Sequence, residues 1–241
     1  MRGFVFARGV PRGAPLIRLH ASVPLCVNPI VRLYWLPLAF LLSPGAFAAD
    51  GDLHPTLKAV EARYNAARTL QVLFREDYTL PGKPRRTESG TLLLRKPGRM
   101  RWEYSQPQGK LFLSDGKFLW LWVPEDNRAE KMKLKEADDM RAPLAFLLGK
   151  LNFEKEFRNI QGSPDAAGTR IVAEPKTDNL PYSRVEFVVS PDNLIKKVKV
   201  TGFDRSVLDY AFDREQMNPD LASKLFEFKP PAGAQVVEGA Q

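Results

Sequence analysis

Apolar and polar residues alternate along most of the chain beyond residue 69, which is the pattern of half-buried strands. In 99–104, Met100, Trp102 and Tyr104 fall on one face and charged residues on the other. The same pattern predicts strands at 70–75, 91–95, 110–114, 117–123, 153–160, 169–173, 184–190, 195–201, 207–212 and 225–228. Tight turns such as Asp115-Gly116 join them. We therefore expect a mainly β (α+β) chain with one antiparallel sheet of about ten to eleven strands that curls or closes.

The segment before the first strand has helical spacing instead. Apolar residues recur there at intervals of three and four residues, at Leu53, Leu57, Val60, Tyr64 and Ala67. This spacing predicts an amphipathic helix of roughly four turns. Asp52 and Pro55 suit its first turn.

A second, short helix is predicted at 143–151, where Pro143 opens an apolar stripe. The stripe consists of Leu144, Leu147, Leu148 and Leu151. A very apolar helix inside a run of strands has to cover something. It either plugs the open end of the curled sheet or acts as a mobile lid.

The predicted strand around Trp120 and Trp122 is apolar on both faces. Only one face of an antiparallel sheet usually meets the core. This strand therefore needs cover on each side, namely a core helix on one side and a second layer or a ligand cavity on the other. A buried central strand and a strand lining an apolar pocket both remain open from the pattern alone.

The N-terminal segment, residues 1–48, carries five arginines and no acidic residue, and it ends in an apolar run at 33–42 followed by Ala46-Phe47-Ala48. This is the layout of a secretory signal peptide, with cleavage predicted after Ala48. The apolar run is shorter than the ~20 residues that span a bilayer, although an uncleaved membrane anchor is the alternative. We expect residues 49–241 to form a single domain.

Composition narrows the classes of function. The chain has 241 residues, 44% of them hydrophobic, and a formal net charge of +8. Without residues 1–48, 31 basic residues face 28 acidic ones, which is too balanced for a nucleic-acid binder by charge. Cys26 and His20 leave with the same segment, and His54 remains. A chain without Cys and with one His lacks the sets needed for Ser-His-Asp, Cys-His or multi-His metal sites, so no catalytic residue, metal or cofactor is predicted.

Short motifs then follow one another in a fixed order. They are Ser89-Gly90, Lys96-Pro97, Met100-Arg101-Trp102, Gln106-Pro107, Ser114-Asp115-Gly116-Lys117, Leu119-Trp120 and, near the C-terminus, Phe226-Glu227-Phe228-Lys229-Pro230-Pro231-Ala232-Gly233. In these motifs and in the order of its elements, the chain resembles the outer-membrane lipoprotein carrier family, LolA.

The resemblance implies an unclosed, curled antiparallel β-barrel with a helical lid over its apolar concave face. It implies a monomeric periplasmic carrier that takes lipoprotein acyl chains from an inner-membrane ABC-type release complex to an outer-membrane receptor. It also implies an apolar lipid-binding cavity, whose expected lining is Leu57, Val60, Met100, Trp102, Tyr104, Trp120, Trp122, Leu144, Leu147 and Leu148.

Two positions depart from the family pattern. Lys96 stands where the family has an Arg that bonds lid carbonyls, and Lys offers a point charge in place of a planar fork. We expect Lys96 to serve as the lid latch. Met100 replaces the usual Phe, and its soft thioether suits varied acyl chains.

Other roles on the same fold stay open. A lipid-binding envelope-stress sensor resembles this chain but carries a further C-terminal domain, and the chain ends shortly after its last predicted strand. An outer-membrane receptor needs a Cys at the mature N-terminus, where this chain has Ala49-Asp50. A carrier of a non-protein glycolipid is a further alternative.

Overall fold

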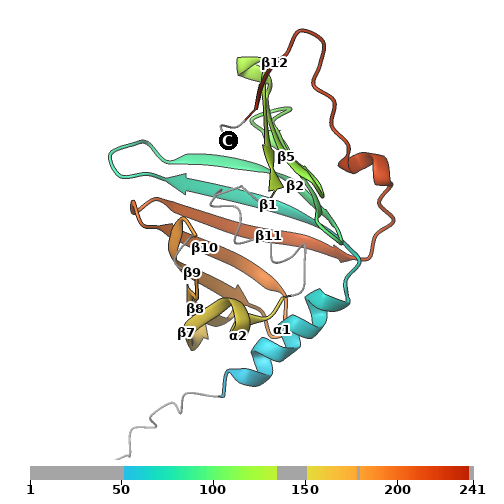
Figure 1. Ribbon diagram of the computed structural model, residues 1–241. Helices are drawn as coiled ribbons and strands as arrows, with labels where there is room; N and C mark the ends of the chain where they lie inside the picture. Colours follow the sequence, from blue (N-terminus) through green and yellow to red (C-terminus); the bar gives the residue numbers. More distant parts are fainter. Residues whose placement is uncertain (1–51, 135–150, 178–179, 239–241) are drawn as a thin grey trace, which may run out of the picture. The chain divides into compact units, whose positions relative to one another are not determined.

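The computed structural model describes residues 52–134, 151–177 and 180–238, all of which belong to one compact unit. Within these residues, twelve strands form a single curved sheet (Figure 1). The strands are β1 (Thr69–Thr79), β2 (Arg86–Arg95), β3 (Arg99–Gln106), β4 (Leu111–Asp115), β5 (Phe118–Val123), β6 (Arg128–Lys133), β7 (Phe157–Asp165), β8 (Gly168–Pro175), β9 (Tyr182–Val189), β10 (Ile195–Gly202), β11 (Val207–Met217) and β12 (Gln235–Glu238). The helices are α1 (His54–Ala66) and α2 (Phe153–Glu156), with 3-10 turns η1 (Pro124–Asp126) and η4 (Ser223–Phe226).

The sheet order is β12-β6-β5-β4-β3-β2-β1-β11-β10-β9-β8-β7, so β12 and β7 form its two edges. Every neighbouring pair is antiparallel except β12 and β6, which run parallel. The pairing of β1 with β11 joins the two halves of the sheet at its centre. This arrangement confirms the prediction of a mainly β chain with an open, curled antiparallel sheet and few helices.

One face of the sheet carries a continuous apolar cluster, because alternate residues of each strand point to the same side. We call it the concave cluster. Its main members are Leu70, Val72 and Phe74 of β1, Leu92 and Leu94 of β2, Met100, Trp102 and Tyr104 of β3, Phe112, Leu119, Phe187, Val198, Tyr210 and Phe212, together with Leu57, Val60 and Tyr64 of α1. The predicted helix thus exists at the predicted place, and its apolar stripe closes onto the sheet.

The opposite face of β2–β5 is covered by the chain's C-terminal segment, residues 218–229. Leu221 and Phe226 of this segment pack with Leu93 of β2 in a second apolar cluster. The guanidinium group of Arg95 donates to the carbonyl of Leu221 at 2.6 Å, and that of Arg101 donates to the carbonyl of Leu225 at 3.1 Å. Residues 218–229 are therefore the second layer that was expected next to β5, the strand that is apolar on both faces.

The close approach of β2 and β3 depends on Gly90. A Cβ atom at this position would lie 2.0 Å from the carbonyl oxygen of Glu103, and the register shifts between Ser89 and Gly90. A residue without a side chain is needed where two backbones approach this closely. The Ser-Gly motif of the sequence therefore marks a backbone contact within the sheet.

Several predicted elements differ from the observed ones. The strand predicted at 225–228 is wrong, since η4 occupies Ser223–Phe226 and its residues pack on the sheet without joining it. The predicted strand at 153–160 begins with the short helix α2, and the strand proper starts at Phe157. Strands β6 and β12 were not predicted, because β6 is rich in charge and β12 is four residues long and mostly exposed. Of the helix predicted at 143–151, only Leu151 lies within the described residues, and it is not helical.

We predict that the C-terminal segment stabilises the sheet through Phe226, which is 1% exposed. Phe226→Ala is expected to lower the free energy of unfolding by about 3 kcal/mol, because it leaves a cavity in the second cluster. The matched control is Phe203→Ala, since Phe203 is 67% exposed and its removal should change stability by less than about 0.5 kcal/mol. Equal urea midpoints for the two variants would contradict this account.

Candidate functional site

The structure brings five of the expected cavity residues together in the concave cluster. Leu57 and Val60 come from α1, and Met100, Trp102 and Tyr104 from β3, each at most 5% exposed. Their neighbours Phe74, Leu92 and Tyr210 belong to the same buried cluster. The alternation of apolar and polar residues in β1 and β11 was the sequence signal for Phe74 and Tyr210. The role of the cluster in lipid binding stays a prediction.

Trp120 and Trp122 lie on the other face of the sheet. In β5 it is Leu119 and Leu121 that join or pack against the concave cluster, so the intervening residues point away from it. Both indole rings pack against Phe228 of the C-terminal segment, with ring centroids 5.5 and 6.3 Å away. The structure therefore does not bring these two residues to the other expected cavity residues. The expected Leu144, Leu147 and Leu148 fall outside the described residues.

Lys96 lies in the turn between β2 and β3, next to the C-terminal end of α1. Its ammonium group donates to the carbonyl oxygen of Tyr64 at 2.6 Å. A helix C-terminus bears partial negative charge and carbonyl groups without a partner in the helix. The Lys96 ammonium group offsets this charge and donates a hydrogen bond to one of these carbonyls. Burial lowers the pKa of Lys96 below its usual value. Within the described residues, Lys96 thus fixes α1 to the sheet, while its role as a lid latch stays a prediction.

The same turn of α1 is held from its other side by Tyr64. The Tyr64 hydroxyl donates to Oε2 of Glu215 on β11 at 2.7 Å and accepts from the backbone N–H of Ile195 on β10 at 2.9 Å. Arg63 donates to Oε1 of the same glutamate at 2.8 Å. Burial, together with the charge of Glu215, raises the pKa of Tyr64. The helix is therefore attached to the central strands by directed bonds as well as by apolar contact.

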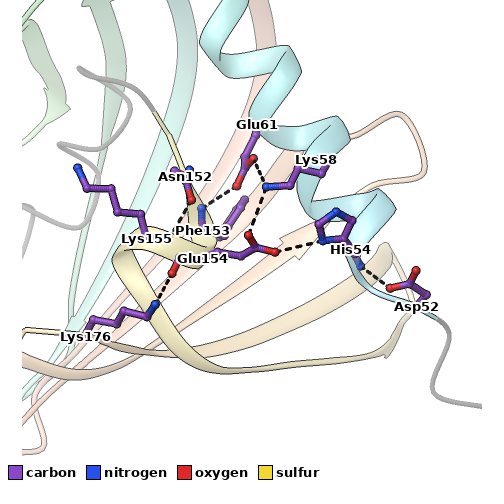
Figure 2. Close-up of polar contacts among 9 residues, drawn as sticks. All are labelled: Asp52, His54, Lys58, Glu61, Asn152, Phe153, Glu154, Lys155 and Lys176. Atoms are coloured by element: carbon purple, nitrogen blue, oxygen red, sulfur yellow. Dashed lines mark hydrogen bonds and ion pairs between the residues drawn. The ribbon is translucent and has the colours of Figure 1, made fainter.

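A second group of polar contacts joins α1 to the segment around α2 (Figure 2). Oε1 of Glu61, a residue only 7% exposed, accepts from the backbone N–H of Phe153 at 2.8 Å. Lys58 bonds the other oxygen of Glu61 and forms an ion pair with Glu154. Nδ1 of His54 lies 3.1 Å from Glu154, at an exposed position. These contacts attach the start of α2 to the N-terminal half of α1.

Asn65 completes this attachment one helical turn after Glu61. Its Oδ1 accepts from the backbone N–H of Leu151 at 2.7 Å, and its Nδ2 donates to the carbonyl of the same residue at 2.8 Å. Sequence reasoning missed Glu61, Asn65 and Glu215. The spacing of Glu61 and Asn65 beside the apolar stripe was the available signal, because it places both on one flank of the helix.

Cavities lead from the C-terminal end of α1 toward the concave cluster. A cavity of about 900 Å³ lies between the end of α1, the β2–β3 turn and residues 218–221, and it holds Arg68, Arg95, Lys96 and Asp220. A small apolar cavity of about 10 Å³ shares Arg68 and Lys96 with it and also contacts Leu70. A further one of about 10 Å³, under Tyr64, is lined by Leu70, Val72, Leu92, Ile195, Phe212 and Glu215. A polar opening therefore adjoins apolar space beneath the helix.

The described residues contain no cluster of three or more His, Cys, Asp or Glu side chains able to hold a metal ion. No helix among them is long and apolar enough to cross a membrane.

Comparison with known proteins adds independent information. Residues 65–229 match the family model described as outer membrane lipoprotein carrier protein LolA. An outer-membrane lipoprotein carrier protein of Chromobacterium violaceum is 28% identical over 206 residues, covering 84% of this chain and 98% of the relative. The outer-membrane lipoprotein carrier protein of Dechloromonas aromatica is 31% identical over 157 residues, covering 65% of this chain and 74% of that relative. The crystal structure of a LolA superfamily protein from Nitrosomonas europaea superposes with a TM-score of 0.42 at 12% identity, covering 73% of this chain and 97% of that one.

We predict that Asn65 controls local opening at Leu151. Asn65→Ala removes both side-chain bonds to the Leu151 backbone, so its amide should exchange with solvent about tenfold faster, as measured by hydrogen exchange. Ser105→Ala is the control, because it removes an exposed side-chain bond to a backbone carbonyl, that of Ser89, far from Leu151 in the sequence. Unchanged protection of Leu151 in the Asn65 variant would refute the proposed attachment.

The half-buried charge of Lys96 predicts a pH effect on stability. Its pKa is lower in the folded protein than the unfolded value of 10.5, so between the two values the unfolded state binds more protons and stability rises with pH. Relative to Lys96→Met, the wild-type free energy of unfolding should therefore increase as the pH rises toward about 10.5. Urea titrations of both proteins across this window measure the difference in the free energy of unfolding, and a constant difference would contradict the lowered pKa of Lys96.

Proposed function

The chain belongs to the outer membrane lipoprotein carrier protein LolA family, and from this premise we propose that it binds the acyl chains of lipoproteins on its concave face. In this role it carries them through the periplasm from the inner to the outer membrane. We propose a carrier that performs no catalysis. Its partners would be an inner-membrane release complex of the ABC type and an outer-membrane receptor, which it would meet as a monomer.

The observation that carries the proposal is the concave cluster itself. It spans both halves of the sheet and includes, among the described residues, the apolar stripe of α1. Burial of an acyl chain stabilises a complex by about 0.8 kcal/mol per CH₂ group. A surface of aliphatic and aromatic side chains buries acyl chains of different lengths and conformations, which suits a carrier with many cargoes.

Release of the cargo follows from the same contacts. In the empty protein the apolar stripe of α1 already packs into the concave cluster. The net binding free energy of an acyl chain is therefore the stabilisation from burying the chain minus that lost when the stripe is displaced. The polar contacts of Tyr64, Glu61 and Asn65 add to the stability of the empty state. This lowers the net affinity of what would otherwise be an almost irreversible complex. We propose that Leu144, Leu147 and Leu148 of the predicted lid also occupy the apolar face in the empty protein and so lower the net affinity for an acyl chain.

The path of the acyl chain is proposed from the cavities. The opening beside Lys96 contains cations and amides, which suit the polypeptide that follows the acylated end of a lipoprotein, and Leu70 lines both small cavities beneath α1. An acyl chain that enters between the end of α1 and β1 would thus meet Leu70 first. Displacement of the Lys96 bond to the Tyr64 carbonyl would free this end of the helix.

The proposal is tested by a polar substitution at Leu70, which is 4% exposed. Leu70→Gln should reduce lipoprotein release from inner-membrane vesicles at least tenfold, because an amide on the acyl path lacks a partner once a chain is bound. The control is Val236→Gln on β12, at a position 48% exposed. Circular dichroism of both variants checks that they are folded.

Wild-type release by a folded Leu70→Gln protein would refute this acyl path. A second measurement is independent of any variant. Mass spectrometry of the protein purified from periplasmic extract should find acylated lipoprotein bound to it, whereas a free glycolipid as the bound species would favour the alternative cargo.

A further inference from the structure

Trp102 occupies the middle of the concave cluster. It lies in β3 opposite Leu92 of β2 and Phe112 of β4, and its side chain is fully buried. The Phe74 ring meets it edge-on, with centroids 4.7 Å apart, and the Tyr210 ring lies at 5.4 Å. The indole is thus surrounded by rings and aliphatic groups, which are poor hydrogen-bond acceptors.

The indole Nε1–H of Trp102 has no hydrogen-bond partner among the described residues. A buried donor without an acceptor is costly, and native structures contain few of them. Two tyrosine hydroxyls of the same cluster do have partners, since Tyr64 donates to Glu215 at 2.7 Å and Tyr104 donates to Glu76 at 3.3 Å. Such an unpaired donor in a buried apolar surface indicates that the acceptor comes from a ligand.

We infer that Trp102 recognises the carbonyl oxygen at the head of an acyl chain. This inference rests on the proposed function and adds to it a point of polar recognition. An acylated cargo consists of CH₂ groups, which match the aromatic surface, and of ester carbonyls, which are acceptors. When the chain displaces the side chains that cover Trp102, its carbonyl supplies the bond that the empty protein lacks.

The consequence is selectivity for acyl chains over plain hydrocarbon chains. An ester and an ether of glycerol with equal chain lengths bury nearly the same apolar area, but only the ester offers a carbonyl. Displacement of a bound apolar fluorophore can compare dipalmitoylglycerol with dihexadecylglycerol on the wild-type protein. The ester should bind about fivefold to tenfold more tightly, which is the net worth of one buried hydrogen bond.

Trp102→Phe keeps an aromatic ring and removes the donor. Both compounds should lose some affinity through the smaller ring, and their ratio should fall to about one. Trp120→Phe is the matched control, because this indole packs against Phe228 on the opposite face, and its ratio should equal that of the wild type. The ratio separates recognition from packing, since a cavity weakens the ester and the ether alike.

The outcomes are distinct. Equal binding of ester and ether by the wild type, or a ratio preserved in Trp102→Phe, would overturn the inference and leave the acyl-carrier function intact. Equal binding by the wild type would mean that a neighbouring aromatic ring, and not a ligand carbonyl, accepts the hydrogen bond of the Trp102 indole. Binding of neither compound by the folded wild type would overturn the proposed function together with the inference.

Discussion

The seating of α1 on the concave face of the sheet is the contact on which the rest of the molecule depends. A curled sheet with one apolar face is not stable in water until that face is covered, and Leu57, Val60 and Tyr64 of α1 pack into the apolar cluster of this face together with Phe153. The contact is apolar at its centre and polar at its margins. Lys96 and Glu215 hold one end of the helix, and Glu61 holds its flank. Apolar contact without such bonds would leave the helix free to slide, because the hydrophobic effect has no direction.

The two faces of the sheet are covered in different ways, which separates stability from binding. On the convex side, Phe226 and Leu221 pack on β2–β4, and arginine side chains from the sheet bond the carbonyls of the same segment. On the concave side, the cover is a helix above small apolar cavities next to a polar opening. A carrier needs one permanent layer and one that can be displaced, and the proposed function assigns these roles to the C-terminal segment and to α1.

Sequence pattern predicted the parts of the fold in which neighbouring residues decide the outcome. The alternation of Met100, Trp102 and Tyr104 fixed their common face, and the helical spacing from Leu57 to Tyr64 fixed the stripe of α1. The pattern failed at Trp120 and Trp122, since a strand that is apolar on both faces carries no local signal of which face is concave. It also failed where partners are distant in sequence, as for Glu215 with Tyr64, and where a charged or short strand is stabilised by its neighbours, as in β6 and β12.

The central pairing of β1 with β11 has a consequence for the order of folding. Leu70 lies opposite Met217 and Thr79 opposite Val207, so the two halves of the sheet join through residues from opposite ends of the chain. Loop closure over such a sequence separation is entropically costly and slow. A chain that emerges from a ribosome or a translocation pore N-terminus first can form the β1–β5 hairpins early. It cannot close the centre of the sheet until residues 207–217 have emerged, and until then the growing chain stays open and accessible to chaperones.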